Sequence, residues 1–446
     1  MRKIQFLVLM VALLGIHWSA AAQCPSTLAE SQIYLFSDGF VSGMDIDVSY
    51  DNSKYLIVNN LQDATTEDRA LYGWEFQVSN NYWTGFAIME DESTWVESYD
   101  SGIAPTTSCY SEAQCATLKR AWATGWAAQT AAGYPNDISA TLGRRYNLGL
   151  SEMDSTPQTV MDGNPYFFHV SSDADGYNNH SLMGSYMQVW SASSQAFDRS
   201  VYYCRKLKGF GSSMFTGASP TVALDYAEPM IDPAPIAVAT WSTSLATDTA
   251  FIVWQDRDAQ GGLVLKRAVV NGSCSFLVDP EVVSTNVLNG QRVAVAAFYS
   301  GFVVAWTGED NEIYMRTYSP SGTPLTSAFA VGSKASGTWR FSPRLDAHRS
   351  RSENYFVVSW QELDTTTGYY NYPYRLYRGL STVTARSTVQ YLDDSSHNIE
   401  PFFSPVPTFF SGCTSDIRIG WAYARYYISG GYREEALVRQ IVSLPL

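Results

Sequence analysis

The chain has 446 residues, of which 43 are acidic and 29 basic, so its formal charge is −14. Hydrophobic residues make up 46% of it and aromatic residues 14%, whereas charged residues reach only 16%. This length excludes a miniature domain that depends on cross-links, and this composition excludes an intrinsically disordered chain. The acidic balance also argues against nucleic acid and anionic membrane surfaces as partners, because both reward clustered Lys and Arg.

The N-terminus has the order of a secretory signal peptide. Arg2 and Lys3 precede an apolar run over residues 6–16, and three alanines follow at 20–22. The run is too short to span a bilayer, which takes about 20 helical residues. We therefore predict a signal peptide over 1–22, with a buried helix as the alternative. Its removal takes away two basic residues, which changes the net charge from −14 to −16. The rest of the chain, 23–446, is predicted to be a single secreted or periplasmic domain without a membrane span.

All six cysteines lie after this segment, which favours disulfides in an exported chain. They are Cys24, Cys109, Cys115, Cys204, Cys274 and Cys413. Six cysteines allow 15 pairings, and the sequence does not choose among them. The short spacing between Cys109 and Cys115 makes this pair our predicted disulfide.

Degenerate repeats organise the second half of the chain. Each begins with an apolar run that ends near a tryptophan, as in FIVW at 251–254 and FVVAW at 302–306. The tryptophans at this position are Trp254, Trp306, Trp360 and Trp421. A polar loop and a second apolar run follow each one, as in IYMRTY at 313–318. Runs rich in β-branched and aromatic residues between polar turns predict strands.

Two weaker copies, at 40–90 and 160–200, bring the predicted number of repeats to six. Units of this size, each a meander of strands, predict an all-β fold, a β-propeller of six blades with four antiparallel strands each. Stacking blades in a ring buries both faces of every sheet, which an isolated meander cannot achieve. A pair of β-sandwiches and a β-helix are the alternatives.

Residues 95–157 do not fit the repeat and predict a helical insertion between the first two repeats. Ser111 is a suitable N-cap, and Gly133 and Pro135 are suitable terminators. Between them, four side chains fall at spacings of three and four: Cys115, Leu118, Trp122 and Trp126. We expect this aromatic stripe to pack onto the ring.

The repeat at 302–322, with its apolar tryptophan strand, its IYMRTY strand and its glycine turn, resembles the loosely defined blades of secreted β-propeller proteins. The resemblance is clear over 230–446 and weaker over 40–90 and 160–200. It implies the fold without a particular activity. The Asp box of sialidase-like propellers is not intact, because DESTW at 91–95 retains only its end.

Aromatic residues suggest sites for carbohydrates, since sugars stack on large amphipathic rings. The four repeat tryptophans are better explained by packing between blades. The candidates for ligand contact lie in expected loops: Trp83, Tyr369, Tyr370 and Tyr372. An exposed loop without a ligand is the alternative for each.

Acidic residues suggest two further sites. Asp173, Asp175 and Asn178 place oxygen ligands at near-alternating positions, as in a calcium loop, although a solvated turn is the simpler interpretation. Calcium is thus the one cofactor suggested, and no other is evident. Asp45 and Asp47 alternate in a predicted strand, so their carboxylates share a face. Such a pair could serve glycoside hydrolysis, although a solvated strand face is again simpler.

No nucleophile, P-loop, dinucleotide or metalloprotease motif is present. Three functions remain. The first is a binding module that recognises a glycan or an extracellular protein on one face of the ring. The second is a glycan-processing hydrolase or lyase, and the third is a structural surface component. Clustered carboxylates with Arg and Tyr in a central pocket would favour the enzyme, whereas aromatic and amide groups would favour the binding module.

Overall fold

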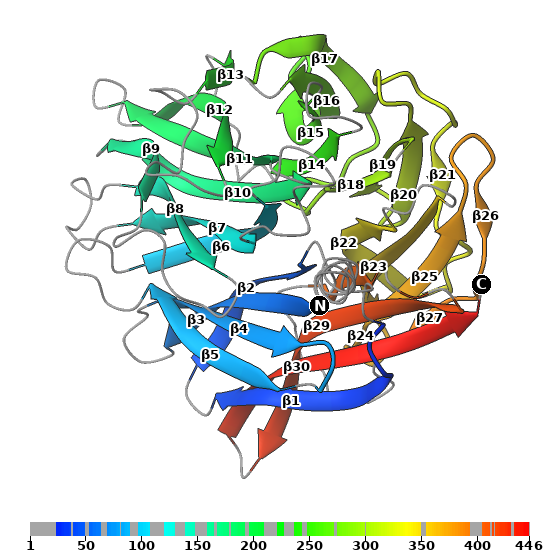
Figure 1. The fold of residues 1–446 in the computed structure, drawn as a ribbon. Helices are drawn as coiled ribbons and strands as arrows, with labels where there is room; N and C mark the ends of the chain where they lie inside the picture. Colours follow the sequence, from blue (N-terminus) through cyan, green and yellow to red (C-terminus); the bar gives the residue numbers. More distant parts are fainter. Residues whose placement is uncertain are drawn as a thin grey trace, which may run out of the picture.

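In the computed structural model, the described residues form strands and no helix (Figure 1). The structure describes residues 24–446 except 37–38, 50–52, 64–68, 81, 90–96, 108–119, 130–138, 148–157, 165–166, 178–179, 192–195, 209–220, 227–235, 243–247, 272–273, 299, 349–353, 393–403, 411–412, 414, 430–431 and 446. The predicted signal peptide and the Cys109–Cys115 pair lie outside the described residues. Within the described part of the chain, no helix is long and apolar enough to cross a membrane.

The strands of the first half form three antiparallel sheets in chain order. The first contains β2 (Gly39–Val48), β3 (Lys54–Asp63), β4 (Arg69–Gln77) and β5 (Trp83–Met89). The second contains β6 (Glu97–Thr107), β7 (Arg120–Gln129), β8 (Ser139–Asn147) and β9 (Gln158–Asn164). The third contains β10 (Phe167–Tyr177), β11 (His180–Ser191), β12 (Ala196–Lys208) and β13 (Thr221–Tyr226).

The second half adds four more sheets. Two of them contain β14 (Ile236–Ser242), β15 (Asp248–Arg257), β16 (Leu263–Asn271) and β17 (Phe276–Ser284), then β18 (Ala294–Phe298), β19 (Gly301–Thr307), β20 (Ile313–Tyr318) and β21 (Phe329–Ala330). The next contains β22 (Thr338–Ala347), β23 (Tyr355–Asp364), β24 (Tyr370–Asn371), β25 (Pro373–Arg378), β26 (Thr384–Ala385) and β27 (Gln390–Tyr391). The last contains β28 (Val406–Phe410), β29 (Asp416–Ser429), β30 (Tyr432–Pro445) and β1 (Leu28–Phe36).

The sheets stand around a common centre, as the blades of a β-propeller do (Figure 1). The first strand of each blade lies innermost and contacts the first strand of the next. These contacts run from β2 through β6, β10, β14, β18, β22 and β28 and then return to β2. The β-propeller prediction is therefore confirmed in its architecture.

The predicted blade number and the helical insertion are wrong. The described residues form seven sheets, and the additional one, β6–β9, occupies the segment assigned to the insertion. Trp122 and Trp126 lie in strand β7. A spacing of four residues is even, so it fits the periodicity of a strand as well as that of a helix. The predicted N-cap at Ser111 and the stop at Gly133 lie outside the described residues.

Alternation along each strand gives every blade two apolar faces. In β15, Phe251 and Val253 pack against blade β18–β21, whereas Ile252 and Trp254 belong to the cluster on the opposite face. Phe251 lies 4.8 Å from Phe302 and 5.1 Å from Tyr318, measured between ring centroids. All residues of the middle strand β19 are buried, while most of the outer strand β17 is not. The core therefore lies between blades.

The repeat tryptophans are core residues, as predicted. Trp254, Trp306, Trp360 and Trp421 are each at most 1% exposed. Trp306 belongs to the cluster shared with blade β14–β17, and Trp360 to the cluster shared with blade β18–β21. The tryptophan signature of the repeat thus reports packing between blades, and it carries no ligand site.

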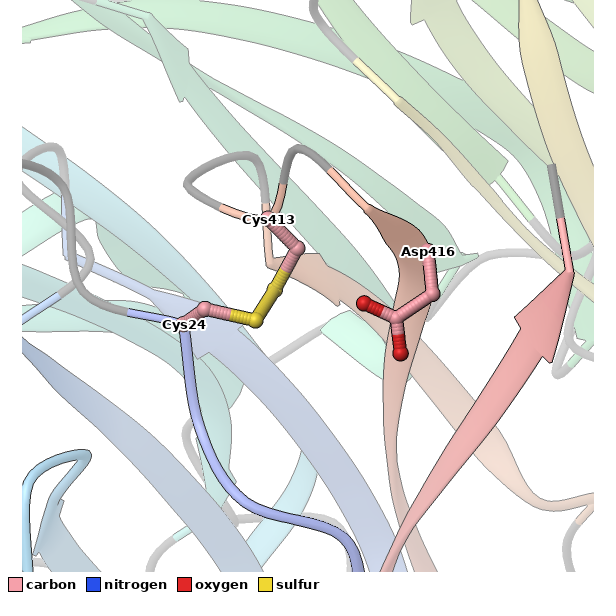
Figure 2. A group of neighbouring side chains, drawn as sticks. All are labelled: Cys24, Cys413 and Asp416. Carbon is pink, nitrogen blue, oxygen red and sulfur yellow. A yellow bond between two sulfur atoms is a disulfide. The ribbon is translucent and has the colours of Figure 1, made fainter.

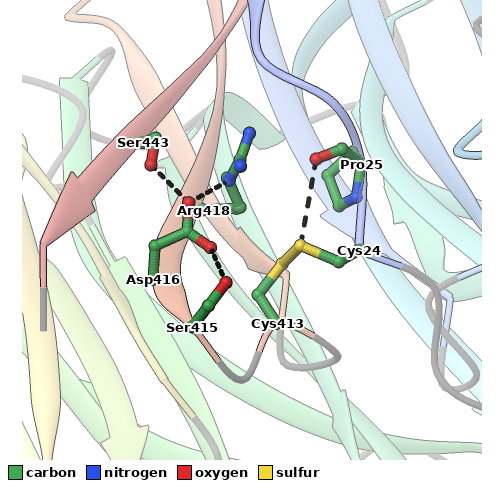
Figure 3. Close-up of a disulfide and its surroundings, with 7 residues drawn as sticks. All are labelled: Cys24, Pro25, Cys413, Ser415, Asp416, Arg418 and Ser443. Carbon is green, nitrogen blue, oxygen red and sulfur yellow. Dashed lines mark hydrogen bonds and ion pairs between the residues drawn. A yellow bond between two sulfur atoms is a disulfide. The ribbon is translucent and has the colours of Figure 1, made fainter.

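The ring closes between the two ends of the chain. β1 pairs antiparallel with β30 as the outermost strand of the C-terminal blade. Cys24, just before β1, forms a disulfide with Cys413 in the turn between β28 and β29 (Figure 3). Beside it, Asp416 accepts hydrogen bonds from Arg418 and Ser443, the first of them 2.5 Å long. Both terminal segments are thereby fastened at one end of one blade.

We expect Cys24→Ser and Cys413→Ser to lower the free energy of unfolding by about 2–5 kcal/mol each, because the cross-link restricts the unfolded chain. The double variant should be no less stable than either single variant, because both remove the same bond. Denaturant midpoints with and without a reductant measure the effect. Unchanged midpoints in the single variants would contradict a stabilising role for this bond.

We also expect stability to fall at alkaline pH. Burial raises the pKa of Tyr374 and of Tyr377 from 10.0 to about 12. The unfolded chain then releases these protons first, so this contribution is complete below pH 10 and is lost as the pH rises to about 12. Tyr374→Phe keeps the ring and removes one titration, so its alkaline loss should be smaller. Urea midpoints of both proteins across this range provide the measurement, and equal losses would contradict the assignment.

Candidate functional site

An exposed aromatic row lies at one end of blade β22–β27. Trp339, Leu363 and Tyr370 are directly opposite one another on β22, β23 and β24. Side chains that are paired in this way point to the same face of a sheet. Trp339 is 48% exposed, and Tyr369, next to the row, is 40% exposed. We call Trp339, Leu363, Tyr369 and Tyr370 the Trp339 platform. Two strand spacings, about 10 Å in total, separate its outer members.

The turn that carries the tyrosines is fixed by its own hydrogen bonds. The Asp364 carboxylate accepts the N–H of Thr366 at 2.8 Å, and this bond is the main reason why the pKa of Asp364 lies below its usual value. The N–H of Asp364 donates to the Tyr369 carbonyl at 3.0 Å. Gly368 has φ +75°, a left-handed conformation that favours glycine. Tyr369 is therefore presented by an ordered turn.

A buried ion cluster supports the other side of the same blade end. Arg340 follows Trp339 and donates to Glu312 at 2.7 Å and to Glu362 at 2.9 Å. Its guanidinium also lies 5.3 Å from the centre of the Trp360 ring. Burial lowers the pKa of Arg340, but the hydrogen bonds to the two carboxylates outweigh it, so the pKa lies above its ordinary value. This cluster joins the start of β22 to blade β18–β21.

Tyr391 completes this end of the blade from its outer strand. It is 49% exposed, and its hydroxyl donates to Glu362 at 3.3 Å. Burial of its hydroxyl end and the nearby Glu362 raise the pKa of Tyr391. The phenol is therefore anchored by its oxygen, while its ring faces outward.

Tyr372 does not belong to the platform, although the sequence grouped it with Tyr369 and Tyr370. It is fully buried, and its hydroxyl donates to the Ala424 carbonyl at 2.8 Å. Its ring stands edge-on to Tyr423, with 5.7 Å between centroids. The residue lies between β24 and β25 and faces the next blade, so it has no surface for a ligand. The expected long loop is in fact a short turn followed by strand.

Trp83 occupies a second exposed position, at the start of outer strand β5. It is 43% exposed, and its neighbour Tyr82 is 63% exposed. We call these two residues the Trp83 edge. The Trp83 ring lies edge-on to Trp74 at 5.5 Å and tilted against Phe76 at 6.5 Å. Trp74 is fixed in turn by its Nε1–H, which donates to Asn59 at 2.7 Å.

A cavity of about 100 Å³ lies among the inner strands β2, β14, β18, β22 and β28. Asp45 and Asp47 both line it, whereas the simpler sequence interpretation placed them on a solvated strand face, and Asp346, Arg292 and Arg344 line it as well. This volume is well below the roughly 300–1,000 Å³ of typical small-molecule sites. The cavity has the carboxylates and arginines that were expected of an enzyme, whereas its lining among the described residues includes no tyrosine.

The carboxylates of this cavity already accept backbone hydrogen bonds. Asp45 accepts the N–H of Ile46 at 2.9 Å, and Asp47 that of Val48 at 2.7 Å. Asp346 accepts from Ala347 with one oxygen and from Phe409 of the next blade with the other, each at 2.7 Å. Asp346 therefore joins β22 to β28.

The proposed calcium ligands lie in and beside a hairpin. Asp173 and Asp175 are part of strand β10, paired in register with Gly184 and Leu182 of β11. They are therefore strand residues and do not form a loop, while Asn178 lies outside the described residues. Calcium binding at this position stays a prediction.

Among the described residues, one group of potential metal ligands gathers: Cys24, Cys413 and Asp416 (Figure 2). The two sulfur atoms are bonded to each other in the disulfide. The group is therefore explained by the closure of the ring.

Sequence reasoning did not single out Trp339 or the Cys24–Cys413 bond. A signal for Trp339 was available, because it is a tryptophan outside the repeated position. The disulfide joins the first and last cysteines of the chain.

Comparison with known proteins shows likeness only in structure. No protein-family model matches the chain, and no curated protein matches its sequence. A fucose-specific lectin from Aleuria aurantia matches with TM-score 0.42 and 12% identity, over 79% of this chain and 97% of the lectin. NanB sialidase from Streptococcus pneumoniae matches with TM-score 0.48 and 8% identity, over 95% and 71% of the two chains. Both TM-scores are below 0.5, so these matches indicate no function for this chain.

We expect Arg340→Leu to lower the free energy of unfolding by about 3–5 kcal/mol, because it leaves two buried carboxylates without their cation. Arg386→Leu, at an exposed position of the same blade, is the matched control and should change stability by less than about 0.5 kcal/mol. Chemical denaturation of both variants compares them. Equal, small losses would show that the ion cluster contributes nothing.

Proposed function

We propose that this protein is a secreted glycan-binding module that holds a neutral carbohydrate chain on its Trp339 platform. The observation that carries the proposal is the register of Trp339, Leu363 and Tyr370, which places the exposed Trp339 ring and the half-buried Tyr370 ring on one face of the sheet. Rings at this spacing can stack on sugar units of one chain. The hydrogen bonds of Asp364 in the turn and the ion pairs of Arg340 hold the platform in place before a glycan binds. This order reduces the conformational entropy that is lost on binding.

The size and charge of the platform favour a glycan over a protein. An aromatic side chain contributes about 150–250 Å², and those of the platform are only partly exposed. A stable protein interface needs about 800 Å² per partner. The formal charge of −14 repels anionic polysaccharides as they approach the protein. Neutral polysaccharides are therefore the best ligands for this surface.

The secreted location rests on the N-terminal pattern and on the disulfide. Disulfides persist in oxidising compartments, where soluble and surface-bound glycans are also found. A disulfide that joins the N-terminal segment to the C-terminal blade is stable in such a compartment and would stabilise a protein that works outside the cytoplasm. Secretion itself is a proposal, which analysis of the mature N-terminus would test.

We expect Trp339→Ala and Tyr370→Ala to weaken glycan binding at least tenfold each, which corresponds to about 1.4 kcal/mol. An array of neutral and anionic glycans identifies the ligand, and calorimetry with a matching hexasaccharide measures the affinity. Trp339→Phe should retain part of the binding, because it keeps an aromatic face. Leu277→Ala, an exposed apolar position on another blade, should bind like the parent protein. Full binding by both alanine variants would contradict the platform, and no glycan binding at all would contradict the function.

The central cavity supports a second candidate function, glycan hydrolysis. Its specific support is the convergence of Asp45 and Asp47 with Arg292 and Arg344. Its small volume and the backbone hydrogen bonds of its carboxylates count against it. Release of reducing ends from the glycans that bind, abolished by Asp45→Asn or Asp47→Asn, would establish this candidate.

A further inference from the structure

The Trp339 platform and the Trp83 edge lie at opposite ends of their blades. Trp339 is near the start of β22, the innermost strand of its blade, whereas Trp83 starts β5, the outermost strand of its own. In a meander of four antiparallel strands, the first and last strands run in opposite directions. The start of β5 therefore lies at the end where β2 finishes.

Short connections place these ends on opposite faces of the ring. Residues 331–337 lead from the outermost strand β21 directly to the innermost strand β22 of the next blade. Seven residues can cross the width of a blade from its outermost to its innermost strand. They are too few to run the full length of a strand as well. Inner strands therefore start on one common face. The Trp339 platform is on that face, and the Trp83 edge is on the other.

The Trp83 ring is the outer member of an ordered aromatic stack. Beneath it, Phe76 stacks on Tyr55 at 4.8 Å, and the Arg439 guanidinium lies 4.0 Å from the centre of the Phe76 ring. Opposite Trp74 on β5 stands Gly85, where a Cβ would come within 2.6 Å of the Trp74 ring. The glycine thus makes room for Trp74, which in turn supports the edge of Trp83. An indole held this firmly loses little freedom when a ligand stacks on it.

The turn before Trp83 is ordered as well. The N–H of Tyr82 donates to the Asn80 side chain at 2.9 Å, and the N–H of Gln77 donates to the Tyr82 carbonyl at 2.8 Å. The backbone of Tyr82 is therefore held in place by two hydrogen bonds, and its side chain is 63% exposed. The edge thus presents two exposed aromatic residues, whose rings can stack on the apolar face of a sugar.

We propose that the Trp83 edge is a second site for neutral glycans and that one molecule therefore links two glycan chains, one on each face of the ring. This inference rests on the proposed function of the Trp339 platform. A glycan is the occupant because two partly exposed rings offer at most a few hundred Å², too little for a protein partner, which needs about 800 Å². Two sites on one rigid ring would also bind a dense glycan layer more tightly than either site alone.

The test compares Trp83→Ala, Trp339→Ala and the double variant in the full protein, with Leu277→Ala as control. Calorimetry with cellohexaose, xylohexaose and chitohexaose gives the number of sites per chain. Turbidity with a soluble polysaccharide of the sugar that binds reports cross-linking. We expect two sites and turbidity for the parent and the control, one site without turbidity for each single variant, and no binding for the double variant.

The outcomes separate the two proposals. One site in the parent, lost in Trp339→Ala and unchanged in Trp83→Ala, would overturn the second site and leave the proposed function intact. No binding of any of the three hexasaccharides would overturn both. Trp83→Phe keeps a ring at the edge and should restore the second site, which distinguishes loss of stacking from loss of folding. Unfolding midpoints of all variants complete the comparison.

Discussion

The structure depends on the pairing of β1 with β30. Every other blade is built from strands that follow one another in the sequence. The closing blade alone takes its outermost strand from the other end of the chain, and the contact between β2 and β28 completes the ring of inner strands. Without this pairing, the terminal blades would each expose an apolar face that needs a neighbour. The Cys24–Cys413 bond reinforces the join at one end of the same blade.

Closure explains why the individual repeats can be so degenerate. Each blade needs apolar side chains on both faces, at positions that meet the neighbouring blades. Phe251 and Ile252 on β15 are an example, because they belong to clusters on opposite faces of the sheet. Large aromatic residues fill the space between neighbouring sheets, and volume matters more than identity in such packing. Charged side chains are buried between blades where they form ion pairs, as Arg340 does with Glu312 and Glu362. This freedom leaves the ends of the blades available for aromatic sites without loss of the core.

The sequence predicted the architecture better than the site. The tryptophan strands were recognisable because burial on both faces demands an uninterrupted apolar run, which a single sequence displays. Blade β6–β9 was missed because its strand β7 is rich in alanine and spaces Trp122 and Trp126 by four, a separation that both periodicities allow. Tyr369 and Tyr370 lie at the surface as expected, but the neighbouring Tyr372 faces a blade that is assembled from distant sequence. Trp339 and Tyr370 share a face only through strand pairing with Leu363 between them, which no local pattern reveals.

The terminal position of β1 determines when the last blade can be completed during folding. During synthesis the first strand emerges long before its partner, since 389 residues separate the two cysteines that flank the join. The blades in between can form in order, because each is built from consecutive strands. The first strand must wait, unpaired, until the last strand has left the ribosome. The closing blade can therefore be completed only after the last strand has been synthesised, whereas the blades in between can fold earlier.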